Sequence, residues 1–236
     1  MNKTVLTAIL MLCAIDSAQA EESGLFRVKA GFGNADYTQE FSDENFTLDG
    51  SFGTQSLSIA YAFPSHSFID LTIRQNASGA EATFSDQLGQ KRELTREDMS
   101  LTWGSADLVS GTQATIGLFS GKTEIAPYKY AHESTGLTFG VARSFSGDLG
   151  SLGIGAGIAL LTSTFTDSNG ASVDSETSTG YSVNASYSYL FTKNVGVSAD
   201  IKYQVYDSTY PTSKYWKSFD DTETITSTNL SLIGQF

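Results

Sequence analysis

The sequence predicts an all-β protein that closes into an antiparallel transmembrane β-barrel of about ten strands, with eight or twelve strands also possible. Three observations predict this fold class. Apolar side chains recur at every second position along most of the chain, short and long connections alternate, and no segment after residue 20 has about 18 consecutive apolar residues. A chain with these features can cross a membrane only with strands that pair within a closed sheet.

The N-terminal residues have the features of a cleavable signal peptide. Lys3 precedes an apolar stretch over 5–15, and residues 18–20 read Ala-Gln-Ala, the small-x-small pattern that signal peptidase accepts. We therefore predict a signal peptide over 1–20 and a single barrel domain over 21–236.

Composition limits the possible partners. The net charge is −12, from 26 acidic and 14 basic residues, and no cluster of Lys and Arg suits a phosphate backbone, so we exclude nucleic acid as a partner. The only cysteine, Cys13, lies inside the predicted signal peptide, which leaves no disulfide or thiol chemistry. We find no metal-ligand spacing and expect no metal or cofactor.

Alternation with a period of two defines the expected strands. Apolar sets spaced by two residues begin near positions 26, 57, 69, 99, 114, 137, 152, 181, 195 and 230. Short turns follow the even-numbered sets. Long polar loops follow the odd-numbered ones, at roughly 37–54, 75–96, 121–131, 166–179 and 207–221. This asymmetry is typical of barrels with short periplasmic turns and long extracellular loops, whereas a soluble secreted β-sandwich, the alternative fold, has no reason to show it.

Aromatic residues predict two girdles at the membrane boundaries. The residues expected next to the short turns are Tyr61, Phe63, Trp103, Phe145, Tyr189 and Phe191, and those expected next to the long loops are Tyr181, Tyr203 and Tyr206.

The C-terminal residues resemble the terminal strand of outer-membrane barrels, which ends in an aromatic residue that the assembly machinery recognises. Leu230, Leu232 and Phe236 carry this likeness, although Gly234 stands where the common pattern has another aromatic residue. At the level of pattern, the whole exported chain is similar to small Gram-negative barrels of the porin-like superfamily. The resemblance implies a location in the cell outer membrane, with membrane lipid, lipopolysaccharide and the assembly machinery as partners.

Seven charged side chains are expected to face the lumen: Arg27, Lys29, Asp70, Arg74, Asp98, Asp200 and Lys202. Their opposite signs predict a structural ion network, because charges at membrane depth usually need partners. A ten-stranded barrel is also too narrow for bulk diffusion. A small solute-conducting barrel is the alternative.

One short motif suggests catalysis. His132-Glu133-Ser134 resembles the His-x-Ser element of lipid A deacylase barrels, in which histidine activates serine. The Asn that typically follows that serine is replaced by Thr135, and no orienting acid can be assigned. We therefore assign no catalytic residue and expect no enzyme activity, with a deacylase-like hydrolase as an alternative.

The outer loops suggest a structural or surface-interaction role with an unidentified ligand. The first loop is acidic, and the fifth is rich in aromatic residues, which suit adhesion or an extended girdle. The acidic residues are Asp36, Glu40, Asp43, Glu44 and Asp49, and the aromatic residues are Tyr206, Tyr210, Tyr215, Trp216 and Phe219.

Overall fold

The computed structural model describes residues 24–42, 46–76, 81–84, 91–107, 109–126, 130–167, 169–213 and 217–236. The predicted signal peptide lies outside these residues. None of the described residues belongs to a helix long and apolar enough to span a membrane.

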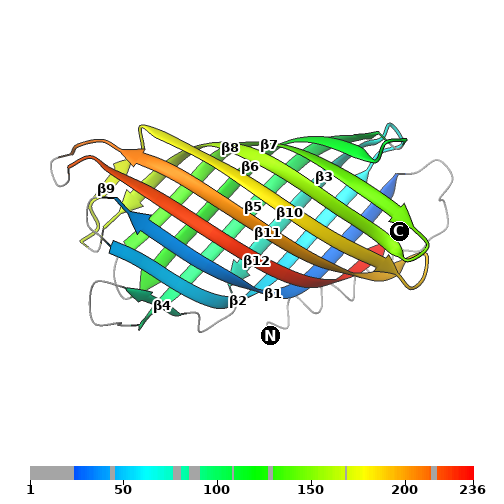
Figure 1. Cartoon of the computed structure of the whole chain (residues 1–236), viewed down its shortest axis with the longest axis horizontal. Coiled ribbons are helices and arrows are strands. Elements are labelled where there is room, and N and C mark those ends of the chain that lie inside the picture. Colours follow the sequence, from blue (N-terminus) through cyan, green and yellow to red (C-terminus); the bar gives the residue numbers. More distant parts are fainter. Residues whose placement is uncertain are drawn as a thin grey trace.

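The described residues form one sheet of long, tilted strands (Figure 1). The strands are β1 (Leu25–Phe41), β2 (Phe46–Ala62), β3 (Ser67–Asn76), β4 (Glu81–Phe84), β5 (Lys91–Asp107), β6 (Thr112–Ala126), β7 (Tyr130–Gly147), β8 (Gly150–Thr166), β9 (Ser172–Asp174), β10 (Thr177–Leu190), β11 (Val195–Tyr210) and β12 (Phe219–Gln235).

The sheet closes on itself. Its order is β1-β12-β11-β10-β8-β7-β6-β5-β3-β2, and β2 pairs with β1 to complete the ring. The short strand β4 continues β3 between β2 and β5, and β9 pairs with the outer end of β8. Counting β3 with β4 and leaving out β9, the described residues form a closed antiparallel barrel of ten strands, which confirms the predicted fold class.

The seam between the first and last strands is paired over its whole length, from Arg27 opposite Gln235 to Phe41 opposite Asp221. At its end the backbone amide of Phe26 donates to the carbonyl of Phe236 at 2.9 Å, and the amide of Phe236 donates back at 2.8 Å. Closure removes the free edge that an open sheet would expose to lipid. The last residue of the chain completes this seam.

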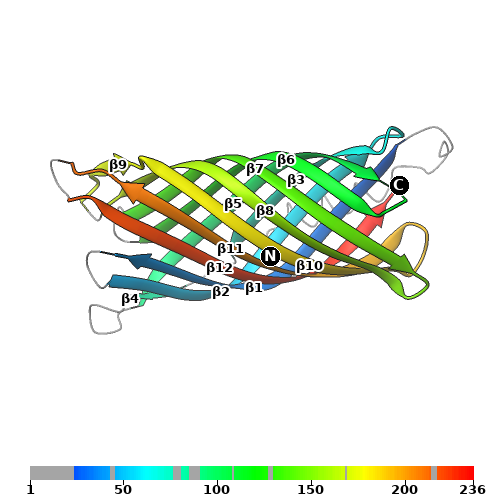
Figure 2. The same cartoon turned by 45° about the horizontal axis from the view of Figure 1, so that its top comes forward.

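Short turns join the strands at one end of the barrel, at 63–66, 109–111, 148–149 and 191–194, and the C-terminus lies at the same end (Figures 1 and 2). This end is the periplasmic one. At the opposite, outer end the strands continue through much of the sequence expected to form loops. For example, β1 extends to Phe41 and β2 begins at Phe46.

An apolar belt surrounds the barrel. We define it by its two rims. The outer rim is formed by the exposed side chains of Phe32, Ile73, Met99, Leu118, Leu137, Leu160, Tyr181, Tyr203 and Leu230. The periplasmic rim is formed by Tyr61, Phe63, Trp103, Phe145, Tyr189 and Phe191, which confirms the predicted inner girdle. Exposed fractions of 60% for Phe32 and 64% for Leu230 leave these side chains against lipid.

Above the belt, the apolar residues of each strand change from the outward-facing positions to the inward-facing ones, and we call this change the reversal of the alternation. In β1, Phe32 points outwards, but beyond it Asn34 and Asp36 are exposed while Ala35 and Tyr37 are buried. β8 changes in the same way, because Leu160 points outwards whereas Leu161 and Phe165 are buried. Lipid requires apolar side chains outside, and water requires them inside, so this reversal marks where each strand leaves the membrane.

The strand ends beyond the reversal carry an acidic collar of exposed carboxylates: Asp36, Glu40, Asp49, Glu81, Glu93, Glu97, Glu124, Glu133, Asp174, Asp207 and Asp220. Threonine hydroxyls donate to some of these carboxylates from directly opposite positions on the paired strand. The pairs are Thr38 with Asp49 at 2.9 Å, Thr164 with Asp174 at 2.7 Å, Thr209 with Asp220 at 2.7 Å and Thr222 with Asp207 at 2.8 Å. Such a surface suits water, so the collar projects beyond the membrane.

Candidate functional site in the barrel interior

The projecting half of the barrel contains a packed core, which we call the outer core. Its buried side chains include Tyr37, Leu48, Phe52, Leu94, Phe119, Ile125, Tyr130, Leu161, Phe165, Val173, Tyr206, Tyr210 and Ile225. The ring of Phe165 lies 5.4 Å from that of Tyr130 and 5.4 Å from that of Phe219, and Phe219 stacks on Tyr210 at 4.7 Å. These contacts fill the lumen with side chains from opposite walls.

Two side chains expected on the surface lie in the outer core instead. Tyr206 was predicted in the outer girdle, but it is buried and stacks on Phe119 at 5.5 Å, so that prediction was wrong. Tyr210 was expected in the fifth loop, as part of an adhesive surface or of an extended girdle, but it is also buried. Both occupy even positions of β11, and these positions face inwards. The fifth-loop residues 214–216 and the first-loop residues 43–45 lie outside the described part of the chain.

A cluster of charged side chains lies within the outer core, and we call Arg96, Asp98, His132, Asp221 and Glu223 the buried ion cluster. The guanidinium of Arg96 contacts Glu223 Oε1 through Nη1 at 2.5 Å, and Asp98 Oδ1 through Nη2 at 2.8 Å. Arg96 therefore balances two carboxylates that water cannot reach freely.

His132 lies on the other side of the two β12 carboxylates. Its Nε2 is 3.4 Å from Asp221 Oδ2, and its Nδ1 is 3.5 Å from Glu223 Oε1. Nε2 also lies 3.0 Å from the hydroxyl of Tyr210. The amide of Gln39 donates to Asp221 at 2.8 Å, so side chains of β1, β7, β11 and β12 meet at this point.

Burial and charge shift the pKa values of these groups in different directions. The outward neighbours of these residues are polar, which places the groups above the belt and outside the membrane-spanning segments. Burial raises the pKa of Asp221 to about 7, although the His132 ring and the Gln39 amide oppose this shift. Burial acts to raise the pKa of Glu223 as well, but the charge of Arg96 and the contact with His132 outweigh it and lower the pKa to about 2. Burial alone would lower the pKa of His132, but Glu223 and Asp221 raise it.

These shifts predict that the folded barrel loses stability as the pH rises through about 7. The pKa of Asp221 lies above its ordinary value of 3.8, so its contribution is fully present below pH 3.8 and is lost through about 7. The raised pKa of His132 acts in the same direction above its ordinary value of 6.5. The lowered pKa of Glu223 stabilises the fold above 4.5, and this contribution is lost only as the pH falls through about 2.

Equilibrium urea unfolding in zwitterionic lipid vesicles should therefore give a larger unfolding free energy at about pH 5.5 than at about pH 8. Asp221→Asn should flatten this dependence, because the substituted side chain cannot ionise. An unchanged slope in that variant would show that Asp221 is not the titrating group.

The two residues of the His-x-Ser motif both face the interior, but no hydrogen bond joins these two described side chains. The Ser134 hydroxyl lies 2.7 Å from that of Ser163, within a buried group of serines that also includes Ser178 and Ser208. Among the described contacts, His132 bonds to Tyr210 rather than to Ser134. A hydrolytic serine needs a base within hydrogen-bonding reach and an open path for its substrate, so this geometry does not favour the deacylase alternative. The described residues include no cluster of side chains suited to a metal ion.

The seven charged residues predicted in the lumen all occupy inward positions, mostly below the outer core. Lys29 lies 3.5 Å from Asp200, and Asp98 belongs to the buried ion cluster. Asp70 accepts bonds from Ser58 and Thr72, and Arg74 donates to Ser227. No hydrogen bond or ion pair joins Arg27 or Lys202 to another described side chain. Only Lys29 and Asp200 form an ion pair within the predicted set.

The buried ion cluster consists mainly of residues that the sequence analysis did not select, namely Arg96, Asp221 and Glu223. Arg96 and Asp221 fall in segments that were expected to be loops, and Glu223 lies between the last of these loops and the apolar set that begins near 230. The period of two does continue through these segments, and the reversed alternation of their polar and apolar residues is the signal that could have identified them.

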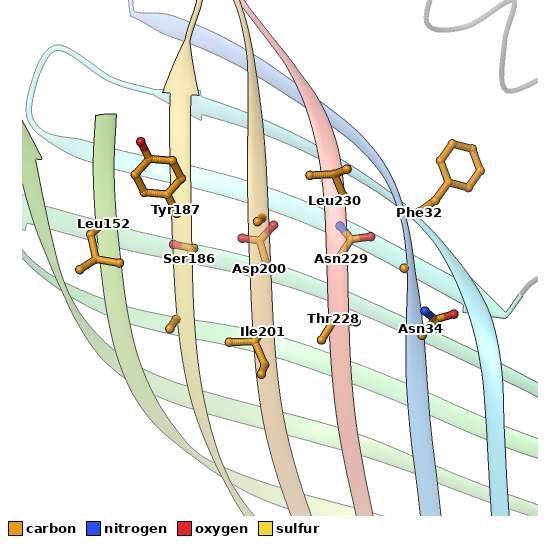
Figure 3. Close-up of a pocket in the computed structure, with 13 residues that line it drawn as sticks. Phe32, Asn34, Leu152, Ser186, Tyr187, Asp200, Ile201, Thr228, Asn229 and Leu230 are labelled. Atoms are coloured by element: carbon orange, nitrogen blue, oxygen red, sulfur yellow. The ribbon is translucent and has the colours of Figure 1, made fainter. Parts of the chain in front are cut away.

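The lipid-facing wall has a hollow over β8, β10, β11, β12 and β1 (Figure 3). The hollow has a volume of about 540 Å³ and forms where the small side chains of Ala185 and Ala199 lie among larger ones such as Leu152, Ile201 and Leu230. Because its outward lining is mostly apolar and lies within the belt, we interpret it as part of the lipid contact surface.

The closed barrel, the apolar belt and the reversal of the alternation define an integral outer-membrane β-barrel protein. No protein-family model and no curated protein matches the chain. Among solved structures, the chain is similar to the outer membrane protein OprG from Pseudomonas aeruginosa, with 12% identity, coverage of 91% of this chain and 97% of that one, and a TM-score of 0.45.

Two further structures show a comparable likeness. For the translocator domain of the autotransporter NalP from Neisseria meningitidis, the identity is 13%, the coverage is 99% of this chain and 96% of that one, and the TM-score is 0.48. For the attachment invasion locus protein Ail of Yersinia pestis, the identity is 14%, the coverage is 91% and 99%, and the TM-score is 0.37.

Proposed function

We propose that the protein is a non-conducting surface barrel, which holds its collar in the lipopolysaccharide layer and presents it for contacts outside the cell. The observation that carries this proposal is the outer core. A conducting barrel needs a continuous water-filled lumen, whereas here buried aromatic rings and the buried ion cluster occupy the projecting half. A filled interior also makes the strand ends a firm platform.

The chemistry of the collar supports contacts with cationic groups. Its carboxylates outnumber the nearby bases, and Lys122 is already held by Glu124 and Glu133 at 2.8 Å each. A negative surface attracts divalent cations, which bridge carboxylates to the phosphates of lipopolysaccharide. We therefore propose cation-bridged lipopolysaccharide headgroups as the immediate partner of the collar.

Single-channel recording in planar bilayers tests the proposal against the solute-conducting alternative. We expect no defined conductance steps from the folded protein, because the outer core blocks the lumen. The matched control is a variant with Phe119→Ala and Tyr206→Ala, which removes two stacked rings from opposite walls and should increase leakage. Migration on SDS gels before and after boiling should confirm that both samples are closed barrels. Regular steps from the unaltered protein would overturn the proposal in favour of a channel.

A further inference from the structure

Two cationic side chains meet inside the barrel, just below the outer core. Arg74, from β3, reaches Ser227 on β12 and donates from Nη1 to its hydroxyl at 2.7 Å. Lys202 on β11 lies directly opposite Ser227 in the β11–β12 pair, where Cβ atoms are about 4.5–5.5 Å apart. The two positive charges therefore lie beside the same serine and repel each other in a partly desolvated space.

Among the described residues, no carboxylate forms an ion pair with Arg74 or Lys202. Asp98 acts electrostatically on Lys202, but two nitrogens of Arg96 already bind it, Nε at 2.9 Å and Nη2 at 2.8 Å. Asp200, the next carboxylate along β11, is paired with Lys29. The described contacts thus leave a local excess of positive charge at Arg74 and Lys202.

Both cations keep donors available for a ligand. Among the described residues, Nη2 of Arg74 and Nζ of Lys202 have no hydrogen-bond partner, and neither is a fully buried atom. Arg74 Nε is fully buried and also has no partner. A guanidinium beside an ammonium and a hydroxyl matches the acceptor oxygens of a phosphate or carboxylate.

The exposure of the inward-facing side chains indicates that solutes reach the site from the periplasmic end. Below it, inward-facing side chains are partly exposed, such as Lys29 at 23% and Asp200 at 28%, and β8 contributes only glycines at 153, 155 and 157. Above it, Tyr206 stacks on Phe119 and Arg96 is buried, so the outer core closes the lumen. Arg27, nearer the periplasmic mouth, adds a positive charge that favours the entry of anions.

We propose that Arg74, Lys202 and Ser227 form a binding site in the lumen for an oxyanion, a phosphate or carboxylate group, of a small solute that enters from the periplasm. The anion accepts bonds from Arg74 Nη2 and Lys202 Nζ and relieves the repulsion between them. This role needs only the closed outer core and does not depend on what the collar contacts.

Calorimetric titration of the folded, detergent-solubilised barrel with inorganic phosphate, and separately with acetate, tests the site and distinguishes the two oxyanions. We expect saturable binding of at least one of them, weakened by about tenfold or more in a variant carrying Arg74→Gln and Lys202→Gln. The control is Arg143→Gln, which removes an exposed cation from the lipid-facing side of β7 and should leave the affinity unchanged. Absence of saturable binding in the unaltered barrel, or equal binding by the double variant, would overturn the proposal.

A second measurement leaves both cations in place, in case the double variant does not fold. Asn184 is exposed, faces inwards and lies directly opposite Lys202 on β10, and the chain has no other cysteine after residue 20. An Asn184→Cys thiol should react several-fold faster with an anionic methanethiosulfonate than with a cationic one, and the bound oxyanion should slow the anionic reagent. Equal rates, or no protection, would contradict the site.

Discussion

Arg96→Ala should lower the unfolding free energy of the barrel by about 3–5 kcal/mol. The substitution removes the cation that lies 2.5 Å from Glu223 and 2.8 Å from Asp98, and it leaves both carboxylates without it inside the outer core. It also removes a bond from Nη1 to the hydroxyl of Thr123 at 2.7 Å. Urea unfolding in lipid vesicles, followed by tryptophan fluorescence, measures the loss.

The chain offers a matched control for this prediction. Lys122 also contacts two carboxylates, at 2.8 Å each, but its side chain is 42% exposed on the collar. Lys122→Ala should therefore cost less than about 1 kcal/mol, since water replaces most of its interactions. Equal losses of unfolding free energy in the two variants would show that the large contribution of Arg96 does not come from the burial of the ion cluster.

Tyr210→Ala should destabilise the barrel by a similar amount, about 3–5 kcal/mol. Tyr210 is 0% exposed, stacks on Phe219 at 4.7 Å and lies 3.0 Å from the ring nitrogen of His132. Truncation leaves a cavity among aromatic rings that strands cannot close without losing their register. The temperature at which the compact form disappears on SDS gels, together with urea unfolding, reports the loss.

Tyr210→Phe separates packing from hydrogen bonding at the same position. The variant keeps the ring and its stacking on Phe219, and it removes only the hydroxyl that meets His132. We expect a loss of about 1 kcal/mol. A loss as large as that of the alanine variant would assign the effect to the polar contact and reject the cavity argument.

The membrane-spanning half of the fold could be predicted from the sequence because lipid imposes a single rule on it. Every second side chain must be apolar, and sets such as those starting at 152 and 181 follow this rule without interruption. The ring order then follows from antiparallel neighbours and short turns. Even the inward positions of Arg74 and Lys202 follow from the same alternation.

The projecting half was harder to predict because its side chains obey the opposite rule. Tyr37 and Phe165 fall on positions that a lipid-facing strand would leave polar. The rule for lipid-facing strands therefore ends the predicted strands where the apolar side chains move from the outward to the inward positions. The buried ion cluster depends in addition on contacts between distant segments. Arg96 and Glu223 are 127 residues apart, and Gln39 and Asp221 are 182 apart, and a single sequence contains no record of such proximity.

The reversal of the alternation also affects how the barrel can enter a bilayer. The exposed carboxylates of the collar must pass through the hydrocarbon before they reach the far side. An ionised side chain at the bilayer centre costs roughly 2.5–3.5 kcal/mol on translocon-insertion scales, which give the lowest values. For a collar of this charge, the summed barrier reaches tens of kcal/mol. Unassisted insertion into an intact membrane is therefore slow, and thinner bilayers accelerate it because they shorten this passage.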